Sequence, residues 1–125
     1  MLNVRDYQPS LLWAKAVAWY EAQPTELIHL RPLGPHDLAL YVYRLDKPGA
    51  YYFHGPKMYW TDAPMSGSHF GNCDQDDLAE SADQLGEVVL YDRRIHKTIL
   101  IGRTFAEALK RLERPFDVWA YDSRI

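Results

Sequence analysis

The sequence predicts a single α+β domain over residues 1–125, with a largely antiparallel sheet, an N-terminal helix and a capped C-terminal helix. One observation behind this prediction is the order of hydrophobic periodicities, which is helix, a group of strands, loop, helix, two strands, helix and strand. Another is composition. With 47% hydrophobic and 14% aromatic residues, a chain of 125 residues can bury one core without cross-links, and an intrinsically disordered chain is excluded.

A helix is expected first, over residues 10–22, where alanine is frequent and Pro24 ends the pattern. Ser10 is a residue type typical of a helix N-cap. One broad apolar face of this helix is formed by Leu12, Trp13, Ala16, Val17, Trp19 and Tyr20. This face is predicted to be buried, with Lys15 and Glu21 on the opposite side.

Strand patterns follow the first helix. The expected strands are Glu26–Arg31, Leu38–Leu45, Tyr51–His54 and Lys57–Thr61. The residues between the second and third of these fit a type II turn, because Pro48 fixes the first central residue and Gly49 tolerates the positive φ of the next. We therefore expect the third strand to pair back on the second as a hairpin.

The middle of the chain is predicted to be loop and then helix. Residues 62–73 contain proline, glycine and small polar residues, which are typical of a loop. A short helix over residues 74–85 is expected next, and its apolar face contains Leu78, Ala82 and Leu85. Two strands should follow it, over Glu87–Tyr91 and Thr98–Ile101.

The clearest helix in the chain begins after Thr104. Thr104 and Glu107 have the spacing of a capping box. The predicted buried stripe of this helix is Phe105, Ala108, Leu109 and Leu112. Pro115 should end the helix, and Phe116–Tyr121 is expected to form a last strand.

Charge is distributed unevenly along the chain. From Met58 to Asp92 there are eight carboxylates and no Lys or Arg, so this acidic segment carries −8. The residues before it carry +1 and those after it carry +4, which gives the net charge of −3. The folded molecule is therefore expected to have an acidic lobe.

Composition also limits the classes of function. A nucleic-acid-binding protein is expected to have a basic face, whereas this chain is mildly acidic. The longest apolar stretch, Leu11–Tyr20, is too short for a bilayer and is interrupted by Lys15. The one cysteine, Cys73, cannot form an internal disulfide, which favours a reducing compartment. We therefore expect a cytoplasmic protein that binds neither nucleic acid nor membrane.

Candidate metal-binding and catalytic residues are present, but no set is complete. His69, Cys73 and Asp74 lie close together in sequence, and His54 could approach them. A second cysteine and a histidine pair with zinc-site spacing are missing, and the acidic run from Asp74 lacks the glycine and glutamate of a calcium loop. We therefore expect no metal and no cofactor. A small enzyme using His54, His69 and an Asp or Cys73 stays an alternative.

Two features point to a protein partner. The aromatic run from Tyr51 to Trp60 is interpreted mainly as sheet packing, with a ligand platform or a protein-binding surface as alternatives. An acidic helix face can simply be solvated, but a long segment without Lys or Arg favours docking of a basic partner such as a nuclease. The residues predicted to bind this partner are Asp74, Asp76, Asp77, Glu80, Asp83, Tyr59 and Trp60.

Two segments in the C-terminal part of the chain resemble domains of the SUKH superfamily. Gly86–Asp92 (GEVVLYD) and Thr104–Leu109 (TFAEAL) are similar to the strand and the final helix with which these domains end. The resemblance implies a non-enzymatic α+β domain of a kind often found in immunity proteins that neutralise toxins. The element order and acidity are also similar to those of type III secretion chaperones, which implies an effector-binding homodimer as a further alternative.

Overall fold

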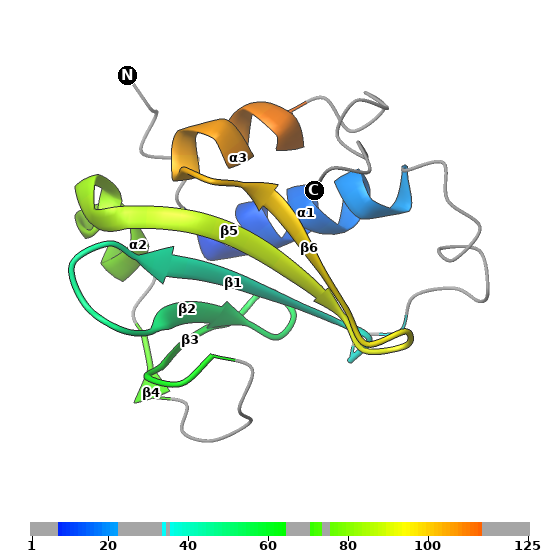
Figure 1. The fold of residues 1–125 in the computed structure, drawn as a ribbon, viewed down its shortest axis with the longest axis horizontal. Coiled ribbons are helices and arrows are strands. Elements are labelled where there is room, and N and C mark those ends of the chain that lie inside the picture. The colour runs from blue at the N-terminus through cyan, green and yellow to red at the C-terminus, as the bar shows by residue number, and fades with distance from the viewer. Residues whose placement is uncertain (1–7, 23–33, 35, 65–70, 74–75, 114–125) are drawn as a thin grey trace.

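The computed structural model describes residues 8–22, 34, 36–64, 71–73 and 76–113. These residues form an α+β domain (Figure 1). The helices described are α1 (Pro9–Glu21), α2 (Asp76–Glu80), the short 3-10 helix η3 (Ala82–Gln84) and α3 (Phe105–Leu112). The strands are β1 (Leu38–Arg44), β2 (Ala50–Phe53), β3 (Met58–Thr61), β4 (Gly71–Asn72), β5 (Leu85–Asp92) and β6 (Lys97–Gly102).

The six strands form one sheet in the order β4-β3-β2-β1-β5-β6, and every neighbouring pair is antiparallel. Short turns join β1 to β2, β2 to β3 and β5 to β6. The segment with α2 and η3 leads into β5, whose first residue, Leu85, pairs with Arg44 at the end of β1. The predicted fold class is therefore confirmed.

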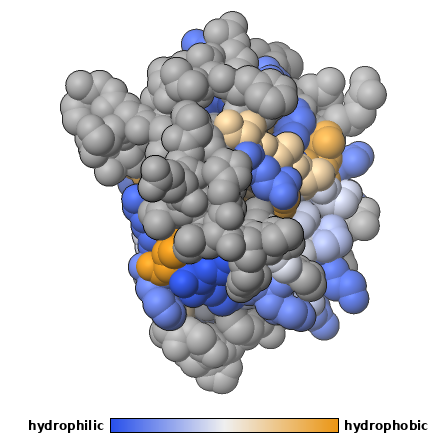
Figure 2. Space-filling model, turned by 90° about the vertical axis from the view of Figure 1, so that its right-hand side faces the viewer, coloured by the Kyte–Doolittle hydropathy of each residue, from blue (hydrophilic) through white to orange (hydrophobic). Residues whose placement is uncertain are grey.

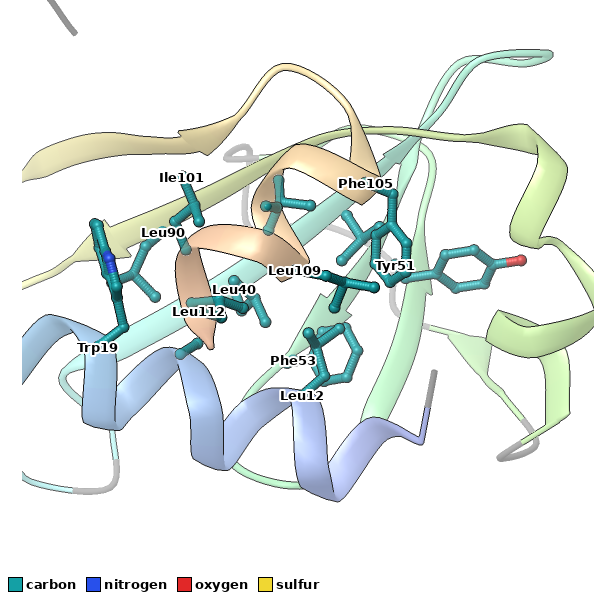
Figure 3. Packing of buried hydrophobic residues seen from close by; sticks show 14 of the residues in the cluster. Leu12, Trp19, Leu40, Tyr51, Phe53, Leu90, Ile101, Phe105, Leu109 and Leu112 are labelled. Carbon is teal, nitrogen blue, oxygen red and sulfur yellow. The ribbon is translucent and has the colours of Figure 1, made fainter. Parts of the chain in front are cut away.

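Helices α1 and α3 cover one face of the sheet, and the main hydrophobic core lies between them and the strands (Figure 3). The side chains labelled there are Leu12 and Trp19 of α1, Phe105, Leu109 and Leu112 of α3, and Leu40, Tyr51, Phe53, Leu90 and Ile101 of the sheet. All four residues predicted for the buried stripe of the last helix are buried. Burial of this apolar surface is the main force that holds the helices on the sheet.

The opposite face of the sheet is rich in tyrosine, and we call it the tyrosine face. Its members are buried Ala39, Tyr41, Ala50, Tyr52 and Val89, with partly buried Tyr43, Tyr59, Tyr91 and Leu100 packed against them. Successive side chains of a strand point to opposite faces. The aromatic run from Tyr51 to Trp60 is therefore divided between the helix-covered core and the tyrosine face, as expected for sheet packing.

Helix α1 begins one residue earlier than predicted, so Ser10 is not its N-cap. The cap position is Gln8, whose side chain makes no capping hydrogen bond, and Pro9 is the first helical residue. Proline suits this position because its ring fixes a helical φ and its missing N–H would have no partner in the first turn. The residues predicted for the apolar face pack as expected, with Leu12, Ala16, Trp19 and Tyr20 buried and Trp13 and Val17 beside them.

The helix predicted over residues 74–85 is shorter in the structure. Helix α2 stops before Ser81, whose N–H donates to two carbonyls of the preceding turn, and η3 follows. The N–H of Leu45 donates to the carbonyl of Gln84 at 2.7 Å, which ties the end of η3 to the β1–β2 turn. This tertiary contact directs Leu85 into the sheet rather than onto a helix face.

The turn between β1 and β2 has the predicted glycine geometry, with a φ of +118° at Gly49. A Cβ there would lie 2.5 Å from the Trp60 ring and 2.7 Å from the Thr61 carbonyl oxygen, so both space and conformation require glycine.

The loop predicted over residues 62–73 is wrong at one place, because Gly71–Asn72 pairs with β3. Edge pairing through main-chain groups needs no hydrophobic alternation, so the sequence carries no signal for this strand.

Two predicted strands, Glu26–Arg31 and Phe116–Tyr121, lie outside the described residues. The described α3 ends before Pro115, as expected. No helix within the described ranges combines the length and the apolar character needed to cross a bilayer.

Candidate functional site

Topology gathers carboxylates at one end of the sheet, which we call the acidic end. It is the end where β1 stops and β5 starts, and where α2 lies (Figure 1, left). The hydrogen bond from Leu45 to Gln84 holds the β1–β2 turn against η3 at this end. The carboxylates placed there are Asp46, Asp62, Asp76, Asp77, Glu80, Asp83 and Glu87, and Lys47 lies in the same turn as Asp46.

Most of these carboxylates face solvent because Leu78 faces the core. Leu78 is fully buried, which turns Asp76 and Glu80 of α2 outward, and Asp83 of η3 is exposed as well. In the part of the chain that the structure describes, these three outward carboxylates form no ion pair. Their charges therefore add to one negative field at the surface.

Arg44 links three side chains of the acidic end by hydrogen bonds. Its Nε and Nη2 donate to the two carboxylate oxygens of Asp46 at 2.8 and 2.7 Å, and its Nη1 donates to the Tyr51 hydroxyl at 2.8 Å and the Ser81 hydroxyl at 2.9 Å. The hydrogen bonds from Arg44 are the main reason that the pKa of Asp46 lies below its ordinary value. The Arg44 side chain is 12% exposed and fully engaged, so it adds little positive charge to this surface.

Leu45 projects from the β1–β2 turn within the acidic end. It is 68% exposed, more than the other large hydrophobic side chain exposed among the described residues, Leu11. Its side chain lies over Gly86, where an added Cβ would come within 2.8 Å of Cδ2 of Leu45. An apolar side chain among carboxylates gives a protein partner both an apolar contact and a charged rim.

The two aromatic residues predicted for partner binding lie on opposite faces of the sheet. Trp60 belongs to the helix-covered face, where its ring packs 5.2 Å from that of Tyr51 and its Nε1 donates to Asp62 at 2.7 Å. The ammonium of Lys47 lies 4.6 Å from the Trp60 ring centre. Tyr59 lies on the tyrosine face. The predicted partner-binding surface therefore cannot include both Tyr59 and Trp60, because they lie on opposite faces of the sheet.

Two other residues of the acidic segment are placed as follows. Asp74 lies outside the described residues. Asp92 is fully buried and accepts hydrogen bonds from the Tyr20 hydroxyl at 2.7 Å and from Nη2 of Arg94 at 2.9 Å. Burial alone would raise the Asp92 pKa, but the hydrogen bonds from Arg94 and Tyr20 lower it below its ordinary value. Asp92 is therefore a structural carboxylate that joins α1 to the end of β5.

The structure places His54 beside His36, a contact that sequence reasoning missed. The two rings meet edge to face with their centres 4.6 Å apart, and Nδ1 of His36 is hydrogen bonded to Nε2 of His54. Arg93 lies against this pair and donates to the main-chain carbonyl of His36 at 3.0 Å. Local spacing carries no signal for a contact between the start of β1 and the end of β2, but the predicted hairpin register could have indicated it.

Among the residues that the structure describes, the proposed enzyme residues form no complete site. His69 lies outside the described residues, and Cys73 is half-buried. Cys73 lines a hollow of about 280 Å³ with apolar and polar neighbours, namely Pro9, Pro56, Lys57, Met58, Tyr59 and Asn72. Within the described ranges, no three His, Cys, Asp or Glu side chains are grouped so that they could hold a metal ion.

The end of the sheet opposite the acidic end is basic, and we call it the basic end. It contains the start of β1 and the β2–β3 and β5–β6 turns (Figure 1, right). The basic and histidine residues there are His36, His54, Lys57, Arg93, Arg94, His96 and Lys97. Figure 2 views the molecule from this side. Among the described residues it shows hydrophilic surface in the lower part, an orange hydrophobic patch beside it and a beige to orange band higher up. Asp37 and the buried Asp92 also lie at this end, and Lys47 lies in the turn at the acidic end, so the two ends differ in net charge without being of one sign each.

Comparison with models of protein families, with curated proteins and with solved structures finds no significant match to this chain.

Proposed function

We propose that this protein is a small protein-binding domain whose acidic end docks a partner with a basic surface. The single observation that carries the proposal is the group of outward carboxylates, Asp76, Glu80 and Asp83, which form no ion pair within the described part of the chain. Charge of one sign accelerates the encounter with an oppositely charged partner and disfavours other partners. Leu45 adds an apolar contact beside these charges.

More specifically, we propose that the protein is a cytoplasmic inhibitor or immunity-type protein that neutralises a toxin or a nuclease. Its support is the similarity of Gly86–Asp92 and Thr104–Leu109 to SUKH domains, together with the acidic end, since nucleases bind their substrate through a basic surface. An effector-binding homodimer of the secretion-chaperone kind is the alternative, and a measurement of mass in solution distinguishes a dimer from a monomer.

The experiment compares three forms of the protein as baits in the source cell extract. The first is wild type, and the second carries Glu80→Lys and Asp83→Lys at the acidic end. The third carries Glu21→Lys at the end of α1 and Glu113→Lys at the C-cap of α3, both exposed positions. Both double variants change the net charge by the same amount. A difference in the proteins that they retain is therefore due to where the charge lies on the surface. The specific partner is the one retained by wild type and by the third form but lost by the second.

Association of that partner is then measured by stopped flow at increasing ionic strength. We expect the acidic-end variant to associate at least about tenfold more slowly than wild type at low salt, and the difference to shrink at high salt. The Glu21→Lys/Glu113→Lys form should associate at nearly the wild-type rate. Equal rates for both double variants would contradict docking through the acidic end.

A further inference from the structure

The basic end contains a cluster that the proposed function does not use. The imidazole rings of His36 and His54 touch each other, and Nδ1 of the first is hydrogen bonded to Nε2 of the second. The guanidinium of Arg93 lies against them. Its Nη1 donates to the His36 carbonyl at 3.0 Å, and its Nη2 donates to the Tyr52 hydroxyl at 2.7 Å. Three separate segments, at the start of β1, the end of β2 and the β5–β6 turn, therefore bring three nitrogen-rich side chains together.

No carboxylate of the described residues pairs with this cluster. The partners of Arg93 are two main-chain carbonyls and one tyrosine hydroxyl, and each histidine of the pair is bonded to the other. The acids next to these residues in sequence have other partners. Asp37 accepts from the Gly34 N–H at 2.6 Å, and Asp92 is buried with Arg94. This lack of a counter-ion occurs in a chain that has more acidic than basic residues.

The cluster disfavours its own full protonation. Burial first, and then the positive charges of His36 and Arg93, lower the pKa of His54. A hydrogen bond between two imidazoles also needs one ring nitrogen without a proton, so it breaks when both rings are fully protonated. An anion bound between the rings and the guanidinium would accept hydrogen bonds from all three groups and would offset their repulsion.

We propose that His36, His54 and Arg93 form a binding site for a tetrahedral oxyanion, such as phosphate or sulfate. The site is open to solvent, because His36 is exposed and His54 and Arg93 are half-buried. Hydrogen bonds to main-chain carbonyls hold the guanidinium in place, so little side-chain entropy is lost when an anion binds. The positive charge of the basic end draws anions toward it. An anion at this site favours the protonated form of His54, so affinity rises as the pH falls.

The test uses the wild-type protein and inorganic sulfate, followed through the histidine ring resonances by NMR. Sulfate keeps the same charge between about pH 6 and about pH 7.5, so any change in affinity over this range comes from a change in the protonation of the protein. Sodium chloride at equal ionic strength is the reference. His96, at the same end and hydrogen bonded to the Tyr91 hydroxyl at 3.1 Å, is the internal control.

We expect sulfate to shift the His36 and His54 resonances in a saturable way, with roughly threefold or greater tightening from about pH 7.5 to about pH 6. Saturating sulfate should raise the pKa of His54, because it supplies the missing negative charge. The His96 resonances should move no more than they do in chloride. Non-saturating shifts that are equal in all three histidines, or equal in chloride, would overturn the proposal.

Variants provide an independent check by calorimetry. His54→Gln and Arg93→Gln should each weaken sulfate and inorganic phosphate binding by roughly tenfold, whereas His96→Gln should leave it unchanged. Unchanged affinity in His54→Gln contradicts the site even if Arg93→Gln fails to fold. None of these variants touches the acidic end, so the oxyanion site and the proposed docking function can fail separately.

Discussion

At the scale of single residues, two Arg–Asp pairs with the same sequence spacing illustrate how burial changes the role of a charge. The side chains of Arg94 and Asp92 are 3% and 0% exposed, whereas those of Arg44 and Asp46 are 12% and 39% exposed. A buried charge that loses its partner keeps its desolvation penalty, while an exposed charge is solvated by water. The same substitution should therefore have different consequences at the two carboxylates.

We predict that Asp92→Asn lowers the free energy of unfolding by about 3 to 5 kcal/mol, because it removes the charge of a fully buried carboxylate that pairs with the buried Arg94 guanidinium. Asp46→Asn is the matched control and should lower the urea midpoint much less, because the Asp46 side chain is 39% exposed. Urea denaturation followed by circular dichroism measures both. Similar midpoints for the two variants would contradict the structural role of Asp92.

The lowered pKa of His54 predicts a pH dependence of stability. Burial, His36 and Arg93 hold this pKa below the ordinary value of 6.5, so between the folded-state pKa and 6.5 the unfolded chain binds more protons than the folded one. Stability should therefore fall as the pH decreases from 6.5 through the folded-state pKa, in buffers without sulfate or phosphate. The change of the free energy of unfolding with pH should be smaller in His54→Gln and unchanged in His96→Gln. Urea denaturation at a series of pH values measures it.

For Cys73 we predict no metal-binding role. The thiol is half-buried in the hollow near the β2–β3 turn, and within the described ranges no three His, Cys, Asp or Glu side chains are grouped so that they could hold a metal ion. Elemental analysis of purified protein should find no stoichiometric transition metal, and Cys73→Ser should fold normally. One zinc ion per chain, lost in Cys73→Ser, would contradict this prediction.

At the scale of elements, α3 shows how a locally encoded helix is fitted to the sheet. The side chain of Thr104 accepts from the Glu107 N–H at 3.1 Å, as predicted from their spacing. At Gly102 the chain passes so close to the helix that a Cβ would lie 2.5 Å from the Ala108 nitrogen. The capping pattern is visible in the sequence, but the need for glycine before it follows only from the close approach.

Phe105, the first residue of α3, is 2% exposed in the main core. We predict that Phe105→Ala lowers the free energy of unfolding by about 3 to 5 kcal/mol, because it removes a large buried ring and leaves a cavity. The exposed neighbour Ala106 is the control position, and Ala106→Ser should change stability little. A chemical denaturation midpoint that hardly moves in Phe105→Ala would contradict the packing of this helix face.

The elements that sequence reasoning predicted well are those whose pattern is local. The stripe of α3 and the strands on either side of Gly49 follow from periodicity and turn chemistry. The errors occur where contacts distant in sequence decide the outcome. The break after α2 depends on the hydrogen bond between Leu45 and Gln84, and β4 depends on pairing with β3.

At the scale of the whole molecule, the antiparallel topology turns an uneven charge sequence into two ends of opposite net charge. Strands that run the length of the sheet place the β1–β2 turn and α2 at one end and the β5–β6 turn at the other (Figure 1). The sequence pattern indicated an acidic lobe. It did not indicate that His36 and His54 meet at the opposite end.

We predict that replacing Asp76, Glu80 and Asp83 by Lys leaves the fold intact. These side chains point to solvent, while Leu78 of the same segment stays buried. The melting temperature should be no lower than that of wild type at low salt, since like charges on one surface repel each other. Differential scanning calorimetry at low and high salt measures this effect. A large fall in melting temperature would show that the carboxylates have a structural role.

The sequence by itself determined the fold class, the core stripe of the last helix and the presence of an acidic lobe. These depend on side-chain periodicity, helix caps and net charge, which are properties of neighbours along the chain. Only the tertiary structure decided that Trp60 lies on the helix-covered face of the sheet and Tyr59 on the tyrosine face. It also decided that Asp92 is buried and that His36 meets His54 beside Arg93. The physical reason is that strand pairing joins residues far apart in sequence, and burial and electrostatic environment depend on that pairing.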